Sequence, residues 1–304
     1  MEEQEFSSIL SPNICDPTIS FSCLVSSGRH EKQITYLADT LPVTARCNRN
    51  IEIWDRNDSI LSRYWSPEDG IATRFFEDGS DSGSHLDSQS HQLTYGEVTP
   101  LGVRQLAYEM GIVDCDDQDH GTTHIQNDKK DRSEIVFYDL GSGVGRLVTQ
   151  MYIDQPDRIA KAIGIELAED RHTIGALALE RIIAEEQYRA EQFRSPYDED
   201  NDVGDRSTLV STNSCPIQLI HGDALELDFD EKTSHVFMSS LCFPEDVLLA
   251  LQKKLLLLPN ISVIAALNRL DLIYHLDGEQ WEERSVMIQM SWGDSIAKIY
   301  HKIV

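Results

Sequence analysis

The sequence lacks the features that mark a membrane protein or a secreted one. In 304 residues, no apolar run approaches the roughly 20 residues that span a bilayer. The opening segment, MEEQEFSSIL, is acidic where a secretory signal is basic, and it has no apolar core. We therefore expect neither a signal peptide nor a membrane span, and we predict a cytoplasmic protein with the nucleus as the alternative.

Cysteine pairs at metal-binding spacing are also absent. None of the six cysteines forms a C-x-x-C pair, so the sequence predicts neither a zinc site nor a redox motif of that kind, and we expect no metal. Scattered cysteines of this type are typical of free thiols in a reducing compartment. They are Cys15, Cys23, Cys47, Cys115, Cys215 and Cys242.

Basic side chains are scarce. Lys and Arg number 26 against 52 Asp and Glu, which gives a net charge of -26. The pair Lys129-Lys130 stands between Asp128 and Asp131, and we see no cluster of Lys and Arg that could form a basic patch. A nucleic-acid partner is therefore disfavoured, because such binding depends on cations that neutralise phosphates. A basic protein substrate suits the charge, or the acids serve solubility alone. Nothing indicates the oligomeric state.

The N-terminal part carries no motif of known chemistry. Ile51 and Ile53 alternate with Glu52 and precede Trp54, which predicts a short strand. Residues 77–90, EDGSDSGSHLDSQS, have almost no apolar side chains to bury and are typical of a linker. We therefore divide the chain into an N-terminal extension, residues 1–92, and a second domain, residues 93–304.

The second domain begins with a helix and then alternates strands with helices. Thr99 suits the cap of the first helix, Pro100 its first position and Gly111 its end. Polar segments at 114–134 and 192–216 are expected on the surface. Apolar runs predict strands at 135–138, 162–165, 217–220, 236–238 and 261–267, and helices beginning near 146 and spanning 170–189 and 245–258.

This alternation predicts an α/β fold with a mostly parallel, doubly wound sheet. The last two strands, 284–292 and 296–304, flank Gly293-Asp294, which is typical of a hairpin turn. Together these segments predict a seven-stranded sheet that ends in an antiparallel hairpin. A ligand is expected beyond the carboxyl ends of the parallel strands.

The segment after the first strand carries the strongest signal. Asp139-Leu140-Gly141-Ser142-Gly143-Val144-Gly145 spaces three glycines for a tight strand-to-helix turn that a ligand can approach closely. The start of the next helix offers free N–H groups to a carboxylate. Arg146 stands where the dinucleotide fingerprint needs glycine, which disfavours a dehydrogenase. Asp139 is suited to orient the loop or to meet an ammonium group.

Two further acids follow the next two strands. Glu166 ends the second strand, about twenty residues after the glycine motif, where a carboxylate can accept hydrogen bonds from both ribose hydroxyls. Asp223 follows the third strand and is suited to accept from an adenine amino group. Each acid alone is a weak signal, but their positions after successive strands predict a nucleoside-binding site.

Two motifs carry a family resemblance over roughly residues 93–270. VFYDLGSGVGR (136–146) resembles the glycine-rich motif of class I S-adenosylmethionine-dependent methyltransferases, and especially of the disruptor-of-telomeric-silencing family, the histone-lysine methyltransferases without a SET domain. TYGEVT (94–99) resembles that family's cofactor loop. The resemblance implies S-adenosylmethionine as cofactor and a protein lysine as acceptor. The cofactor residues that it implies are Tyr95, Gly96, Glu97, Thr99, Asp139, Gly141, Ser142, Gly143, Gly145, Glu166, Asp223 and Ala224.

The sequence departs from this family where the acceptor would bind. The family has N-N-F-A-F after the fourth strand; here Ser239-Ser240-Leu241-Cys242-Phe243 stands, and only Phe243 matches. Ala224 replaces an aromatic residue that packs on adenine. Ser239 and Ser240 are our candidates to position an amine, with Phe243 shaping its channel. Protein methylation is favoured, while a small-molecule methyltransferase and a non-catalytic cofactor-binding module stay open.

Overall fold

The computed structural model describes residues 48–66, 69, 96–113, 135–192, 215–270 and 280–303. The predicted linker 77–90, the polar segment 114–134, residues 193–214 of the polar insertion and Tyr95 lie outside the described residues. Within the described ranges, no helix combines the length and the apolarity that crossing a membrane requires.

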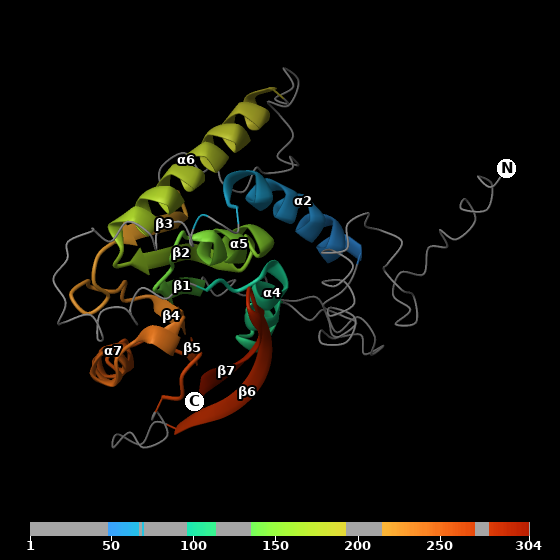
Figure 1. The fold of residues 1–304 in the computed structure, drawn as a ribbon. Coiled ribbons are helices and arrows are strands. Elements are labelled where there is room, and N and C mark those ends of the chain that lie inside the picture. The colour runs from blue at the N-terminus through green and yellow to red at the C-terminus, as the bar shows by residue number, and fades with distance from the viewer. Residues whose placement is uncertain are drawn as a thin grey trace, which may run out of the picture.

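The described residues form a seven-stranded sheet with the order β3-β2-β1-β4-β5-β7-β6 (Figure 1). Strands β1 to β5 pair in parallel, and β7 is antiparallel to both β5 and β6. The predicted α/β fold with a C-terminal antiparallel hairpin is therefore confirmed. The strands are β1 (Ile135–Leu140), β2 (Ile159–Glu166), β3 (Ile217–His221), β4 (Thr233–Met238), β5 (Val263–Ala266), β6 (Gln280–Met290) and β7 (Gly293–Ile303).

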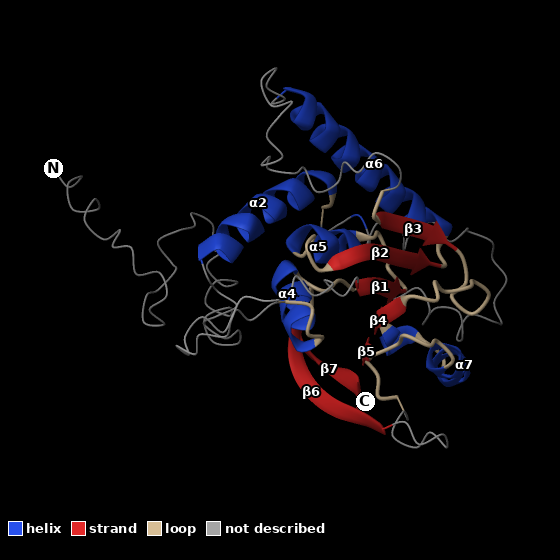
Figure 2. Cartoon of the chain, turned by 180° about the vertical axis from the view of Figure 1, so that it is seen from behind, coloured by secondary structure: helices blue, strands red, loops and turns tan. Residues whose placement is uncertain are grey.

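Two apolar cores lie on opposite faces of this sheet, because successive side chains of a strand point to opposite sides. From β1, Ile135 and Phe137 join the core beneath α2, α4, α5 and α6, whereas Val136 and Tyr138 join the core beneath α7. Figure 2 shows the same separation, with α7 apart from the other helices. The helices are α2 (Asn48–Tyr64), α4 (Pro100–Glu109), α5 (Arg146–Asp154), α6 (Glu169–Gln192) and α7 (Glu245–Leu256).

Helix α4 begins and ends where the sequence predicts. The Thr99 hydroxyl accepts from the Gly102 amide at 3.1 Å, Pro100 takes the first position, and Gly111 has a positive φ of 71° after the end. The residues just before the helix bridge to the hairpin, since Val98 pairs with Met290. The segment that precedes α4 is thus attached to the C-terminal hairpin.

The predicted strand at residues 51–54 is wrong, because these residues belong to α2. Trp54, Asn57, Leu61 and Trp65 are all buried, at spacings of three and four residues. This helical repeat covers three turns, whereas the alternation that predicted a strand covers only four residues. The longer pattern determines the structure.

The hairpin turn also differs from the prediction. Strand β6 ends at Met290 and β7 begins at Gly293, so Ser291 and Trp292 form the turn rather than Gly293-Asp294. Ile288 and Met290 are buried in the core, and their burial sets the register of the pair. The position of the turn therefore follows from packing, and the glycine lies at the first paired position of β7.

Helix α2, although it belongs to the N-terminal extension, packs on α5 and α6. The buried Arg104 of α4 joins it to the domain: its guanidinium lies 2.7 Å from Asp58 of α2 and 3.1 Å from Asp154 of α5. The same guanidinium carbon lies 4.9 Å from the centre of the Trp54 ring. Asn57 donates to Asp154 at 2.8 Å. Residues of α2 thus share one buried polar network with the domain.

We expect Arg104→Met to destabilise the protein strongly. The substitution leaves Asp58 and Asp154 without their cation, and breaking a buried ion pair in this way costs roughly 3–5 kcal/mol. Urea denaturation followed by circular dichroism measures the free energy of unfolding. Arg284→Met is the matched control, because Arg284 pairs with Glu282 at the surface and its loss should leave the midpoint unchanged. Equal midpoints for the two variants would contradict this account of the network.

Candidate functional site

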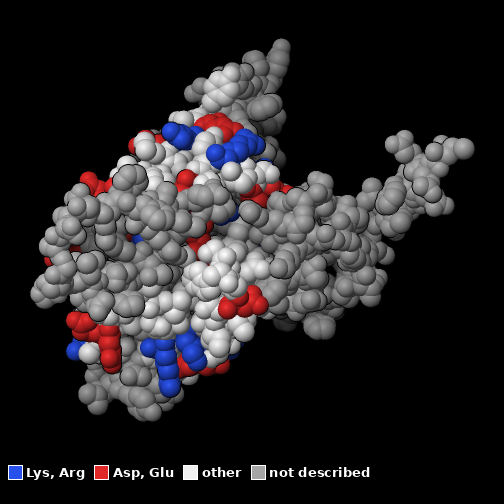
Figure 3. All heavy atoms as spheres, viewed as in Figure 1, with Lys and Arg blue, Asp and Glu red and all other residues white. Residues whose placement is uncertain are grey.

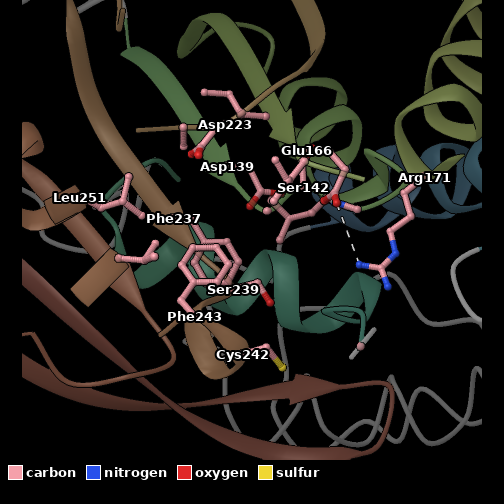
Figure 4. A pocket seen from close by; sticks show the side chains of 18 of the residues that line it. Asp139, Ser142, Glu166, Arg171, Asp223, Phe237, Ser239, Cys242, Phe243 and Leu251 are labelled. Carbon is pink, nitrogen blue, oxygen red and sulfur yellow. Dashed lines mark hydrogen bonds and ion pairs between the residues drawn. The ribbon is translucent and has the colours of Figure 1, made fainter. Parts of the chain in front are cut away.

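A cavity of about 310 Å³ lies beyond the carboxyl ends of β1 to β4 (Figure 4). Strand β1 lies between β2 and β4, and the chain leaves it toward β2 on one side and returns at β4 on the other. Open α/β sheets bind ligands at such a reversal of strand order. The walls come from the loop after β1, the ends of β2 and β3, the turn η6 (Ser240–Cys242) with its neighbours, α7 and residues 96–98.

The loop after β1 presents bare backbone to this cavity. Gly141 and Gly143 have positive φ values of 82° and 57°, a region that residues with a side chain rarely adopt. The amides of Gly141 and Ser142 both donate to the Ile165 carbonyl, at 2.9 and 3.0 Å. A Cβ at Gly141 would lie 3.1 Å from the Phe243 ring. The turn is therefore tight, and it is fixed against β2.

Glu166, at the end of β2, is held by backbone amides. One carboxylate oxygen accepts from the Gly143 amide at 2.7 Å and the other from the Ala168 amide at 2.9 Å. The Arg171 guanidinium lies 4.0 Å from the Glu166 carboxylate, and the side chains of Glu166 and Arg171 are both buried. Because a carboxylate oxygen can accept more than one hydrogen bond, Glu166 keeps acceptor capacity toward the cavity.

Asp139 is the electrostatic anomaly of the site. It is 2% exposed, lines the cavity, and its Oδ1 has no hydrogen-bond partner. Burial raises the pKa of its carboxyl well above the usual range, and the charge of Glu166 adds to this rise. Buried polar atoms without partners are rare and often belong to binding sites. A cation in the cavity would satisfy the Oδ1 atom and oppose both causes of the pKa shift.

The loop after β3 forms another wall of the cavity, and Lys254 of α7 binds it through hydrogen bonds. Asp223 accepts from the Leu225 amide at 2.8 Å, and Ala224 and Leu225 both line the cavity. The Lys254 ammonium donates to the carbonyls of Ala224, Leu225 and Leu227. The apolar Leu167 also lines the cavity, although 61% of its surface is exposed. This part of the site is rigid and offers an apolar surface to a ligand.

Residues 96–98 complete the rim beside the hairpin. The Glu97 amide donates to the Ser291 hydroxyl at 3.2 Å, and the Ser291 amide donates to the Glu97 carbonyl at 2.7 Å. The Trp292 ring covers Gly96 so closely that a Cβ there would lie 1.5 Å from a ring carbon. The Glu97 carboxylate lies 3.7 Å from the Arg146 guanidinium. The hairpin turn therefore fixes this segment at the cavity.

The residues after β4 separate into two groups. Ser239, Cys242 and Phe243 line the cavity. Ser240 does not: it is fully buried, and its hydroxyl accepts from the Asn268 amide at 2.8 Å. The turn η6 thus directs the two neighbouring serines to different surroundings. Only Ser239 has access to a ligand in the cavity.

Most of the residues predicted from sequence meet at this cavity. Tyr95 lies outside the described residues, and neither Thr99 nor Gly145 reaches the cavity, since Thr99 caps α4 and Gly145 packs against Leu219. The predicted residues that line it are Gly96, Glu97, Asp139, Gly141, Ser142, Gly143, Glu166, Asp223, Ala224, Ser239 and Phe243.

Sequence reasoning missed several residues of the wall. Arg146 follows the glycine motif directly, and Arg171 lies in the first turns of the helix after Glu166, so their positions gave a usable signal. Phe237 and Leu251 are ordinary core residue types, and no sequence signal separates them from the rest of the core. Among the described residues, no group of three or more His, Cys, Asp or Glu side chains could hold a metal ion.

On the face of the molecule drawn in Figure 3, the charged side chains of the described residues are mixed in sign. On the face drawn in Figure 3, Lys and Arg lie in small groups next to Asp and Glu. Acidic residues outnumber basic ones by two to one in the whole sequence, 52 against 26. This distribution differs from the continuous basic stripe that is typical of nucleic-acid-binding domains.

No family model matches the sequence, and no curated protein matches it. Solved structures give distant likenesses. A Streptococcus pneumoniae protein named as a candidate tRNA (m1A22) methyltransferase has 16% identity and a TM-score of 0.35; the match covers 56% of this chain and 64% of that one, less than two thirds. The Synechocystis magnesium protoporphyrin IX methyltransferase with bound S-adenosylmethionine has 11% identity and a TM-score of 0.38, and the match covers 81% of this chain and 97% of that one. M. capricolum TrmK with S-adenosylhomocysteine has 11% identity and a TM-score of 0.32, and the match covers 56% of this chain and 62% of that one.

These likenesses are too distant to carry an argument about activity. The strand order and the terminal hairpin give the chain the mostly parallel, seven-stranded α/β sheet that the sequence predicts. The narrower resemblance to the disruptor-of-telomeric-silencing family has no support from the comparisons. A fold alone does not define a substrate.

Asp139→Asn tests the electrostatics of the site through stability. Because the pKa of Asp139 is raised, the folded protein keeps a proton at a pH where the unfolded chain has released it. The stabilisation is complete below the usual aspartate pKa and is lost as the pH rises through the raised pKa. Asparagine cannot ionise, so we expect the variant to be the more stable protein at neutral pH, with the difference shrinking toward acidic pH. Urea denaturation across this pH range measures the effect, and a variant of lower stability at neutral pH would contradict it.

Proposed function

We propose that the protein is an S-adenosylmethionine-dependent methyltransferase. The observation that carries the proposal is the partnerless, buried Oδ1 of Asp139 in a cavity that also exposes the bare backbone of Gly141 and Gly143. The cofactor has an ammonium group and a sulfonium, and a buried carboxylate without a partner suits a cation. The cavity volume, about 310 Å³, lies within the roughly 300–1,000 Å³ of small-molecule sites.

Each part of the cofactor has a candidate partner among the residues of the cavity. Asp139 would hold the ammonium group. The start of α5 and Arg146, whose Nε has no hydrogen-bond partner, would hold the carboxylate. Glu166 would accept from the ribose hydroxyls with the acceptor capacity that the two backbone amides leave free. Asp223 and Ala224 lie on the loop that Lys254 clamps and would contact the adenine.

The reaction asks the protein for alignment rather than for acid–base chemistry. When bound, the cofactor supplies a methyl group whose bond to a positively charged sulfur breaks as the acceptor's electron pair forms the new bond. Phe237, Phe243 and Leu251 form apolar walls of the cavity and would exclude water from the reacting atoms. Fixed walls also reduce the entropy lost in bringing the two reactants together.

The acceptor in this proposal is the amine of a protein lysine. A net charge of -26 favours a basic partner over a polyanion. The amine must be neutral to act as a nucleophile, and apolar walls such as Phe243 lower an amine pKa by desolvation. The Ser239 hydroxyl, which lines the cavity, would accept a hydrogen bond from this amine. The resemblance of residues 94–99 and 136–146 to lysine methyltransferases supports the same choice.

Cofactor binding gives the first test of this proposal. Calorimetry with S-adenosylhomocysteine should detect binding to the wild type, and Asp139→Asn should weaken it by roughly 10- to 100-fold, the range expected for a charged hydrogen bond. Affinity should fall as the pH drops through the raised pKa of Asp139, since protonation removes the anion, and the variant should lose this pH dependence. Asp228→Asn is the matched control at an exposed position and should bind normally. No heat of binding with wild type would refute the proposed function.

Methyl transfer from the radiolabelled cofactor to a cell extract gives the second test. We expect label in the protein fraction, and after hydrolysis in methylated lysine, with wild type but not with Gly143→Arg, which fills the cofactor loop. Label in the small-molecule or RNA fraction alone would refute the lysine acceptor and keep the enzyme class. Binding of cofactor with no transfer to any fraction would identify a non-catalytic module instead.

A further inference from the structure

We propose that Trp65, which directly follows α2 in the N-terminal extension, is a positioning residue of the cofactor site; this rests on the proposed function. Its indole N–H donates to the carbonyl of Val144 at 2.7 Å. Val144 lies between Gly143 and Gly145 in the glycine loop, and Trp65 is only 2% exposed. A residue far from the predicted site thus contacts the backbone of the loop that forms it.

The contact matters because glycine gives the backbone on the C-terminal side of Val144 unusual freedom, whereas Glu166 restrains the loop on the other side through the Gly143 amide. The orientation of the peptide between Val144 and Gly145 depends on the φ of Gly145, which is 75°, and glycine adopts positive and negative φ with similar ease. Two hydrogen bonds select the observed orientation: Trp65 holds the carbonyl oxygen, and the Gly145 amide donates to the Ser142 carbonyl at 2.9 Å. Without the indole, one of these two restraints is lost.

The Val144 carbonyl lies in close packing with α6. A Cβ at Gly175 of α6 would lie 2.5 Å from the Val144 oxygen, so the glycine there gives room for this carbonyl. A Cβ at Gly145 would lie 2.5 Å from the Leu219 side chain. The peptide is therefore enclosed by α2, α6 and β3, and its only indole donor among the described residues is Trp65.

Helix α2 is rigid enough to act in this way. At the end near Trp65, Tyr64 and Arg63 both bind the carboxylate of Glu185 on α6, with Arg63 at 2.7 Å. In the middle of the helix, Asp58 binds the buried Arg104. The helix that precedes Trp65 is thus anchored to α6 and to α4, and the indole itself is buried.

A coupling between two sites is reciprocal. If Trp65 fixes the loop for the cofactor, then the cofactor in turn should stabilise the contact between α2 and the loop. The N-terminal extension would then belong to the cofactor site energetically, although none of the described residues of α2 lines the cavity.

Trp65→Phe removes the donor and keeps an aromatic ring, and Trp54→Phe is the matched control in the same helix. Trp54 is also buried, at 4%, but its ring stacks on Arg104 and does not touch the loop. Both variants should lower the melting temperature. Only Trp65→Phe should raise the dissociation constant of S-adenosylhomocysteine, by roughly 5- to 10-fold, the effect of one hydrogen bond. Equal affinities for the two variants would overturn the proposal.

A measurement without cofactor separates this proposal from the proposed function. Hydrogen exchange of the peptide covering residues 140–150 should be faster in Trp65→Phe than in wild type, and unchanged in Trp54→Phe. Unchanged exchange in both variants would refute the positioning role, whatever the protein binds. If exchange responds as expected but the wild type binds no cofactor, the loop contact stands and the methyltransferase proposal fails.

Discussion

The fold of this protein depends on one turn of bare backbone, the glycine loop between β1 and α5. The loop needs positive φ at three glycines, and Ser142 is the residue between Gly141 and Gly143 whose side chain lines the cavity. Its neighbours are adapted to it: a Cβ at Gly164 of β2 would lie 2.7 Å from the Ser142 hydroxyl, and one at Gly175 of α6 would meet the Val144 carbonyl. Strand β2 and helix α6 therefore each carry a glycine where they pack against this single turn.

The same turn brings two acids together where water is scarce. Asp139 precedes the loop and Glu166 is bound to its amide, and both are buried, which raises the pKa of Asp139. Such an arrangement lowers the stability of the free protein, and proteins commonly keep a loss of this kind at functional sites. A cation in the cavity would relieve this loss, which is the electrostatic basis of the proposed cofactor site.

The parallel sheet and its acids could be predicted from sequence because both depend on local patterns. Apolar runs identified β1 to β5, and polar residues after the first four runs identified the cavity edge. Two of the failures come from packing over long distances. The hairpin turn at Ser291-Trp292 follows from the burial of Ile288 and Met290, not from turn composition. Ser240 was chosen by its neighbour in sequence, but a bond to Asn268, 28 residues away, turns it from the cavity.

The N-terminal extension illustrates the same limit at the scale of domains. The composition of residues 77–90 differs from that of the rest of the chain, and the sequence alone therefore favours a boundary there. The contact from Trp65 to Val144 spans 79 positions across that boundary. Because the entropy of closing a loop grows only slowly with its length, a long connection between α2 and α4 is a weak obstacle to such a contact. A composition boundary therefore marks where the chain changes character, while the buried network of Arg104 and the indole of Trp65 show that residues on its N-terminal side pack against the second domain.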